Sequence, residues 1–235
     1  MTRGGRRVAI TGLGVVAPAG LGVDDFWSGL LGPGITGGTA TEIDDWDPSP
    51  YFESPKQARR ADRVEQFALA AAGEAFDMAG GVDAIGVEPS RFGTIFATGV
   101  GGLHTLEEQV LVRVEKGERR VSPFLVPMMM VNASGAAVSM RYGLRGPLET
   151  ICTACAAGTH AIGYAARLIE WGIVDAVATG GTKSAATVTL RNGEELRLED
   201  SQDVSRKNDG VVVLKSGGKD GQWFSWREVE RIELD

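Results

Sequence analysis

Cys155 lies where an apolar, strand-like stretch gives way to small residues and then to an amphipathic stretch, in the segment 148–158, LETICTACAAG. A thiol at the start of a helix is close to unpaired backbone N–H groups and to the positive end of the helix dipole. Both favour the thiolate, which is the nucleophilic form of cysteine. The pattern therefore predicts that Cys155 is a nucleophile.

A second cysteine, Cys152, gives the spacing CxxC. This spacing after a strand and at the start of a helix is also typical of thioredoxin-like oxidoreductases, so thiol redox chemistry is an alternative function. By itself, Cys152 fits a small buried hydrophobe in the strand. A zinc site needs more ligands than the two histidines and two cysteines of this sequence offer at metal-binding spacing, so we expect no metal and no cofactor.

His160 lies five residues beyond Cys155. A histidine near a thiol is a candidate for the base that activates it. Its position on the same predicted helix puts its side chain more than one turn away from the sulfur. We therefore expect a packing or interface role for His160. The other histidine, His104, follows a glycine-rich turn and has no obvious partner in the sequence.

The neighbouring elements must hold Cys155 in a sharp turn. Residues 158–171 predict a helix because their apolar side chains recur at helical spacing, and Gly172 ends it. Residues 173–178 predict a short strand, so strand, helix and strand form a parallel crossover. Four small residues crowd the turn, as a tight elbow with an exposed nucleophile requires: Ala154, Ala156, Ala157 and Gly158.

Upstream of this unit, strand-like and helix-like segments alternate in the manner of an α/β fold. The strand at 92–97 precedes a glycine-rich segment, 99–102. A further strand is expected at 8–11, and helices are expected over 24–31, with Asp24 as its cap, over 57–78 and over 126–140.

Gly12, Leu13 and Gly14 fit the start of a dinucleotide-binding fingerprint. Pro18 and Gly20 follow where a helix should begin and bind the pyrophosphate, so we predict a structural turn instead. Gly12, Gly14 and Pro18 break the apolar stretch, which argues against a secretory signal.

The character of the sequence changes after Gly181 to a charged, β-rich segment. We therefore predict two domains, residues 1–182 and residues 183–235, the second a small all-β module. Strands at 187–190 and 195–198 flank Asn192-Gly193, which suits a type I′ hairpin turn. A second strand pair is expected within 211–226, and a last strand over 229–234.

The chain has 235 residues, 43% of them hydrophobic, and a formal net charge of −7. This composition is that of a soluble globular protein and argues against a nucleic-acid groove. No apolar run approaches the roughly 20 residues of a membrane span, and two cysteines without a disulfide framework indicate the cytoplasm. Four basic residues form either a solvated helix end or a site for an acidic carrier protein: Arg113, Lys116, Arg119 and Arg120.

Between Arg7 and Gly181, four segments in order resemble the N-terminal half of the elongating, type II β-ketoacyl-acyl-carrier-protein synthases. These segments are RRVAITGLGVVAPAG, ATGVGGLHTLEEQ, VSPFLVPMMMVNASGAAVSMRYGLRGP and TICTACAAGTHAIGYAARLIEWGIVDAVATGG. The resemblance implies an α/β fold that is half of a thiolase-like fold. It also implies an acyltransferase of fatty acid or polyketide synthesis.

In that family, the residue matching Cys155 takes an acyl chain from acyl carrier protein, and its backbone N–H contributes to an oxyanion hole. The resemblance further implies that the acyl pocket is lined by residues in two stretches, Val100 with Gly101 and Met128 with Met129. The two stretches also line the dimer interface in that family. Acyl carrier protein and a second copy are therefore the expected partners.

The family has two copies of one α/β unit, and the second carries two catalytic histidines, a lysine and a gating phenylalanine. This sequence contains only the first copy, so we expect acyl transfer to Cys155 but little condensation by the chain alone. A non-catalytic remnant, scaffold or carrier-binding protein is the alternative. The face that would meet the second copy should be apolar and uncovered, which predicts self-association or a complementing chain.

Overall fold

The computed structural model describes residues 7–32, 43 and 46–182, and four strands beyond residue 185. The chain divides into two units, residues 1–197 and 198–235, and each is described by itself. The helices are α1 (Val23–Leu31), α2 (Pro55–Ala58), α3 (Arg63–Met78), α4 (Leu103–Lys116), α5 (Leu125–Met129), α6 (Ala133–Tyr142) and α7 (Ala157–Glu170). The strands before residue 183 are β1 (Val16–Ala17), β2 (Gly20–Leu21), β3 (Phe92–Ala97), β4 (Leu148–Ile151) and β5 (Ala176–Gly181).

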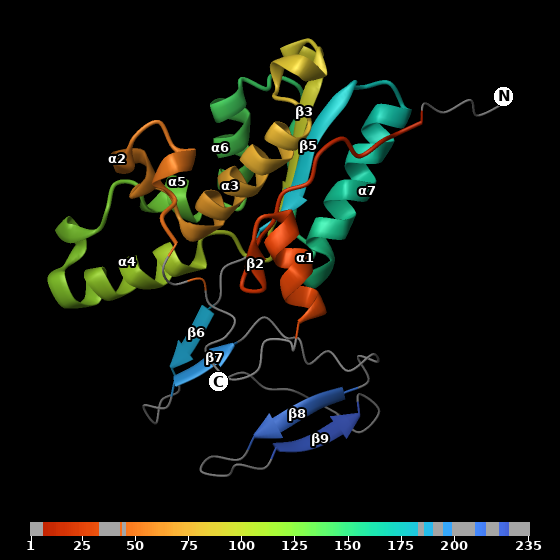
Figure 1. Cartoon of the computed structure of the whole chain (residues 1–235). Coiled ribbons are helices and arrows are strands. Elements are labelled where there is room, and N and C mark those ends of the chain that lie inside the picture. The colour runs from red at the N-terminus through yellow and green to blue at the C-terminus, as the bar shows by residue number, and fades with distance from the viewer. Residues whose placement is uncertain are drawn as a thin grey trace. The chain divides into compact units, whose positions relative to one another are not determined.

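A three-stranded parallel sheet with the order β4-β3-β5 lies at the centre of the first unit (Figure 1). Thr94 of β3 is in register with Leu148 on one side and with Ala178 on the other. The chain leaves β4, passes through α7 and returns as β5, so the predicted parallel crossover is confirmed. The returning strand pairs with β3 rather than with β4, and β4 is therefore an edge of this sheet.

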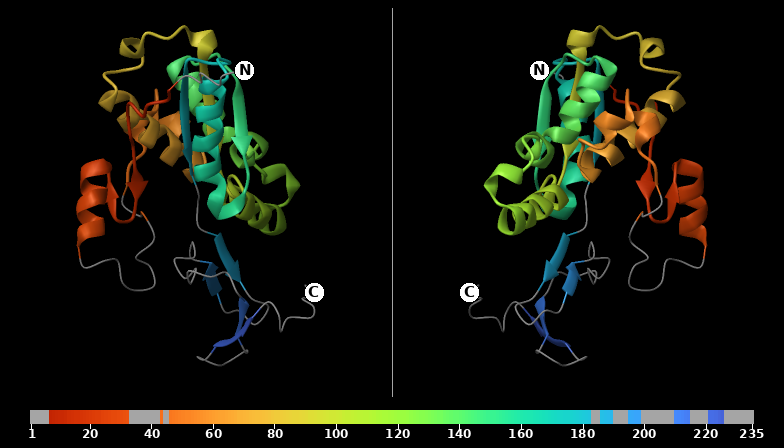
Figure 2. Two further views of the ribbon diagram at one scale, coloured as in Figure 1. Left: turned by 90° about the vertical axis from the view of Figure 1, so that its right-hand side faces the viewer. Right: turned by 90° about the vertical axis from the view of Figure 1, so that its left-hand side faces the viewer.

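β3 is buried along its whole length and separates two hydrophobic cores. Successive strand side chains point to opposite faces, so Phe92 and Phe96 pack with α3 and α6, whereas Ile95 and Ala97 pack with α7. The side views in Figure 2 show α7 running along one face of the sheet. The resulting arrangement is a helix layer on each side of a parallel sheet, as predicted for an α/β fold.

Two of the predicted helices are interrupted. Asp62 separates α2 from α3 because its backbone is extended (φ −64°, ψ 159°) and its carboxylate accepts a hydrogen bond from Val64 N–H, which makes it a helix N-cap. Met130 has an extended backbone (φ −63°, ψ 140°) between α5 and α6. Asp24 was also wrongly predicted as the cap of α1, because it lies within the first turn and Gly22 precedes the helix.

The strand predicted at 8–11 is wrong, because these residues pair with no strand in the described part of the chain. The following segment lies against α3 instead. A Cβ atom on Gly12 would lie 1.9 Å from the carbonyl oxygen of Ala75, and one on Gly14 would lie 1.8 Å from that of Ala71. These glycines are thus required for close backbone packing, in agreement with a structural rather than a nucleotide-binding role.

Glu74 of α3 fixes the turn that follows these glycines. Its carboxylate accepts hydrogen bonds from Val15 N–H at 2.8 Å and from Val23 N–H at 2.6 Å. The short antiparallel pair β1–β2 lies between these two donors. One side chain therefore anchors both the β1–β2 pair and the start of α1 to α3.

β5 begins three residues later than the predicted strand 173–178, because Asp175 N–H donates to the Arg91 carbonyl before the ladder starts. The Arg91 guanidinium also forms an ion pair with the Asp175 carboxylate. Hydrogen bonding to this carboxylate raises the pKa of Arg91. The backbone and side-chain contacts together fix the register of β3 and β5 where the two strands begin.

The β-rich segment contains β6 (Ala186–Thr189) paired with β7 (Glu195–Leu198), and β8 (Gly210–Leu214) paired antiparallel with β9 (Gly221–Ser225). Both predicted strand pairs are confirmed. The turn at Asn192-Gly193 and the strand predicted over 229–234 lie outside the described residues. The domain boundary after residue 182 stays a prediction. Among the described residues, no helix combines the length and the apolar character needed to cross a membrane.

The start of α3 is a buried capping box. Asp62 accepts from Val64 N–H at 3.0 Å, and Glu65 accepts from Asp62 N–H at 3.1 Å. Burial of its carboxyl raises the pKa of Glu65 to about 7, and the neighbouring Asp62 charge adds to this rise. The folded chain consequently binds a proton at Glu65 under conditions in which the unfolded chain has released it.

This proton predicts a pH dependence of folding. Stability from the protonated Glu65 is complete below its ordinary pKa of 4.5 and is lost as the pH rises through about 7. We expect Glu65→Gln, which keeps an acceptor oxygen without titrating, to remove this loss. At pH 8 it should be more stable than the wild type, by on the order of 2 kcal/mol.

Urea unfolding at pH 5 and at pH 8 measures this difference. The control is Glu115→Gln, which removes one carboxylate from an exposed position of α4. Parallel stability changes of the wild type and Glu65→Gln between the two pH values would contradict the prediction.

Candidate active site

Cys155 lies in a tight turn between β4 and α7. The turn is the 3₁₀ segment Ala154–Ala156, closed by a hydrogen bond from Ala156 N–H to the Thr153 carbonyl at 3.2 Å. Ala154 has a φ of 49° and is the non-glycine residue with a positive φ in the described chain. The turn thus directs the chain sharply from strand to helix, and the Cys155 side chain is exposed, as predicted.

Small residues allow the start of α7 to lie directly against the sheet. Ala157 is fully buried, and the Cα atom of Gly158 lies 2.8 Å from where a Cβ atom on Gly181 would stand. A side chain on Gly181 would push α7 away from the end of β5, whereas a Cβ atom on Gly158 would make an ordinary contact 3.7 Å from the Gly181 Cα atom. The predicted crowding of small residues therefore has a definite cause, namely contact between the first turn of α7 and β5.

Cys152 is exposed, so the prediction that it is buried in the strand is wrong. It follows the last residue of the edge strand β4, where only one side of the chain is covered by β3. Its Sγ donates a hydrogen bond to the Gly99 carbonyl at 3.1 Å. This bond connects the cysteine turn to the glycine-rich segment that follows β3.

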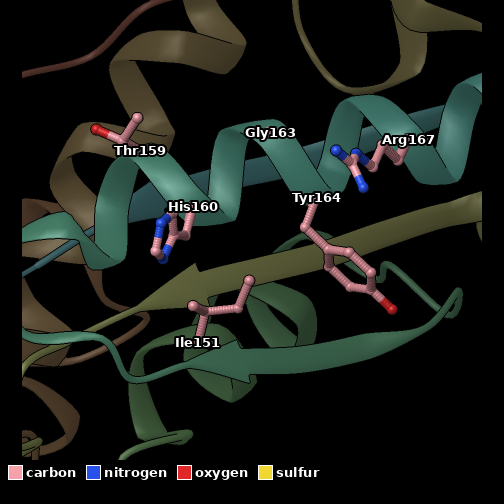
Figure 3. Close-up of a pocket in the computed structure, with 6 residues that line it drawn as sticks. All are labelled: Ile151, Thr159, His160, Gly163, Tyr164 and Arg167. Atoms are coloured by element: carbon pink, nitrogen blue, oxygen red, sulfur yellow. The ribbon is translucent and has the colours of Figure 1, made fainter.

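His160 interacts with the cysteine turn through Thr153, because its Nδ1 lies 2.8 Å from Thr153 Oγ1. His160 also lines a hollow of about 360 Å³ between α7 and β4. Figure 3 shows His160 and Tyr164 projecting from α7 towards the β4 side, where Ile151 points towards them. His160 is exposed, so the predicted packing or interface role stays a prediction, and the contact with Thr153 has no signal in the sequence.

The residues predicted to line an acyl pocket fall into two groups that the fold brings together. Gly101 is buried with a φ of 88°, and a Cβ atom there would lie 2.7 Å from the Met129 carbonyl oxygen. Gly102 N–H donates to the same carbonyl at 3.2 Å. Met128 and Met129 are half-buried in α5, whereas Val100 is 62% exposed.

Exposed apolar side chains are frequent on the described part of the first unit. Val110, Leu111 and Val114 form an exposed apolar stripe on α4, and Ile162 of α7 is also exposed. A contiguous exposed apolar patch can mark a surface that contacts another protein. Self-association and a complementing chain stay predictions.

The basic residues at the end of α4 are also exposed. Arg113 forms an ion pair with Glu118 at 2.7 Å, which partly neutralises that position. Arg119 and Arg120 lie in the following 3₁₀ turn, Glu118–Arg120, and are open to solvent. Within the described residues, no group of three or more His, Cys, Asp or Glu side chains is arranged to hold a metal ion.

Comparisons with known proteins agree with this arrangement. Residues 32–209 match the family model described as the N-terminal domain of β-ketoacyl synthases. The match continues past Gly181, where the four sequence motifs end, and includes the β6–β7 pair.

Two curated relatives are named 3-oxoacyl-[acyl-carrier-protein] synthase 2. The protein from Synechocystis sp. is 34% identical over 239 residues, and the alignment covers 91% of this chain and 56% of the relative. The protein from Vibrio harveyi is 37% identical over 239 residues with the same coverage. The chain thus spans about half the length of these relatives.

Solved structures give the same fold. The ishigamide ketosynthase/chain length factor superimposes with a TM-score of 0.65 at 26% identity, covering 80% of this chain and 49% of that chain. A type II polyketide ketosynthase in complex with its acyl-carrier protein also gives 0.65, at 23% identity, covering 74% of this chain and 50% of that one. The α/β fold is accordingly of the thiolase-like, ketosynthase type, and the chain belongs to the β-ketoacyl synthase family through its N-terminal domain.

Proposed function

We propose that Cys155 accepts an acyl chain from an acyl carrier protein thioester. The observation that carries this proposal is the exposed thiol in a tight turn at the start of the 14-residue helix α7. Family membership supports it, because the curated relatives are 3-oxoacyl-[acyl-carrier-protein] synthases. A solved ketosynthase of the same fold is in complex with an acyl-carrier protein.

In the proposed step, the Cys155 thiolate attacks the carbonyl carbon of the acyl thioester. A new carbon–sulfur bond forms, the bond to the carrier sulfur breaks, and the carrier leaves as a thiol after taking up a proton. The N-terminal end of α7 favours the negative charge that develops on the carbonyl oxygen. Val100, Gly101, Met128 and Met129 are the proposed contacts of the acyl chain.

Intact-protein mass after incubation with an acyl carrier thioester tests this function. We expect an acyl adduct on the wild type and on Cys152→Ala, and none on Cys155→Ala, because only Cys155 lies in the turn before α7. Cys152→Ala is the matched control, since it removes the other exposed thiol of the CxxC motif.

The same variants separate the alternative functions. An adduct absent from all three folded proteins would favour a scaffold or carrier-binding protein. Reversible loss of two mass units on oxidation that needs both cysteines would instead favour thiol redox chemistry. In the cytoplasm, where we predict that the chain works, both thiols would be kept reduced.

We propose that an acidic carrier protein docks on the basic end of α4. Arg119→Glu with Arg120→Glu should lower the rate of acyl transfer from the carrier by about tenfold, because attraction becomes repulsion. The matched control is Arg141→Glu with Arg145→Glu, which reverses two exposed arginines elsewhere. Transfer from a small acyl thioester without the carrier should be the same in both variants. If Arg119→Glu with Arg120→Glu lowers the rate of transfer from the small thioester as much as the rate from the carrier, the docking site is contradicted.

Condensation is a separate proposal, because the chain spans about half of its curated relatives. His104 lies in the first turn of α4 and His160 lies on α7, so the described residues place the two histidines of the sequence on different helices. We propose that a further ketosynthase half supplies the acid–base groups. The chain by itself should then form acyl-Cys155 without a β-ketoacyl product.

We also propose a homodimer formed through the open edge of β4. The Pro147 carbonyl accepts from Thr94 N–H of β3, and the Ile151 carbonyl accepts from Thr98 N–H, directly after β3. The alternate residues Leu148 and Thr150 therefore direct their backbone groups to the open edge. Such an edge is a ready site for pairing with another strand.

Thr150→Pro tests the edge, because proline removes the outward N–H while the bonds to β3 remain possible. Analytical ultracentrifugation should show a dimer for the wild type and a monomer for the variant, at equal circular dichroism. A folded variant that stays dimeric would exclude this edge as the interface.

A further inference from the structure

A single buried carboxylate, that of Asp62, caps two helices. Asp62 is 2% exposed. Its Oδ1 accepts from Val64 N–H at 3.0 Å in the first turn of α3, and its Oδ2 accepts from Thr105 N–H at 3.0 Å and Thr105 Oγ1–H at 2.6 Å in the first turn of α4. Thr105 itself is 3% exposed, so water cannot easily replace the carboxylate as its acceptor.

The same carboxylate touches the glycine loop, which we define as residues 99–102. A Cβ atom on Gly102 would lie 2.9 Å from Asp62 Cγ and 2.3 Å from the Met128 carbonyl oxygen. The backbone of Gly102 is therefore held between the Asp62 carboxylate and α5. This contact places the end of the glycine loop beside the two methionines of the proposed acyl pocket.

The other end of the glycine loop is tied to the cysteine turn and to β3. Gly99 accepts from Cys152 Sγ at 3.1 Å, and Gly101 N–H donates to Thr98 Oγ1 at 3.2 Å. Glycines have no side chain that could fix their conformation. The position of the glycine loop thus depends on these external contacts. Asp62 contributes the close packing against Gly102 and the hydrogen bonds to Thr105, three residues further along the chain.

We propose that Asp62 is a positioning residue that fixes the glycine loop and thereby the shape of the acyl pocket beside Cys155. This inference rests on the proposed acyl transfer for its consequence in the reaction. The effect of Asp62 on the conformation of the glycine loop is a property of the folded chain, so it can be measured without any substrate.

Asp62→Asn separates the two caps. An asparagine is best placed with its oxygen towards Val64 N–H, because the Thr105 hydroxyl can turn to accept from the amide group whereas Val64 offers only a donor. Thr105 N–H then loses its acceptor. The cap of α3 is retained and the cap of α4 is lost. Thr105→Val is a milder variant that removes only the hydroxyl hydrogen bond.

Ser134→Ala is the matched control. Ser134 is 2% exposed, and its hydroxyl donates to the Val64 carbonyl at 3.1 Å. The substitution Ser134→Ala therefore removes a buried hydrogen bond to the first turn of α3 without changing any contact of the glycine loop. Its loss of stability gives the purely structural effect for comparison.

Two measurements test the proposal. Amide hydrogen exchange of residues 101–105 should be about tenfold faster in Asp62→Asn, as expected for the loss of one helix cap. The ratio of long-chain to short-chain acylation rates at Cys155 should also change by about tenfold, as expected if the pocket shape depends on the same helix cap. Thr105→Val should change the exchange rate and the chain-length ratio in the same direction as Asp62→Asn, but by less. Ser134→Ala should change neither the chain-length ratio nor the exchange rate of residues 101–105.

The proposal is overturned if the amides of residues 101–105 exchange in Asp62→Asn at the wild-type rate. It is also overturned if the ratio of long-chain to short-chain acylation rates is unchanged in this variant. If Asp62→Asn does not fold, Thr105→Val decides by the same two criteria. A folded wild type that takes no acyl group would refute the proposed function and the pocket role. Amide exchange would then still decide whether Asp62 holds the glycine loop.

Discussion

β3 is hydrogen-bonded along both edges and buried on both faces, and the positions of the cysteine turn and the glycine loop depend on it. Its pairing with β4 fixes where the chain enters the cysteine turn, and its own end leads into Gly99. A parallel ladder also requires the long crossover through α7. The nucleophile and the glycine loop therefore follow two neighbouring strands that end at the same edge of the sheet, where α/β folds usually bind ligands.

The cysteine turn is held by packing rather than by local preference. Ala154 adopts a positive φ, which costs an L-residue about 1 to 2 kcal/mol. The close contact of Gly158 with Gly181 and the burial of Ala157 keep α7 against the sheet and so maintain this conformation. The strained residue is Ala154, directly before Cys155. Its conformation turns the thiol outward, while the following helix α7 remains regular.

Buried polar contacts join the layers at the same end of the sheet. The Val64 carbonyl accepts from Ser134 Oγ–H of α6 and from Thr182 Oγ1–H beyond β5. Asp62 links α3 with α4, and Gln66 donates to the carbonyls of Ala58 and Ala61. Such bonds add little net stability, but leaving any of these groups unpaired in the interior would be costly. They therefore specify one arrangement of the helices around the cysteine turn.

The sequence by itself determined the α/β class, β3, α7, the exposure of Cys155 and the family, because each depends on a local pattern or an ordered set of motifs. It misplaced the strand at 8–11 and joined α2 to α3, since apolar content shows neither a strand partner nor a cap in use. Only the tertiary structure decided that β5 pairs with β3, that Cys152 bonds Gly99 and that Asp62 caps two helices. These contacts join residues distant in sequence, and no spacing along the chain encodes them.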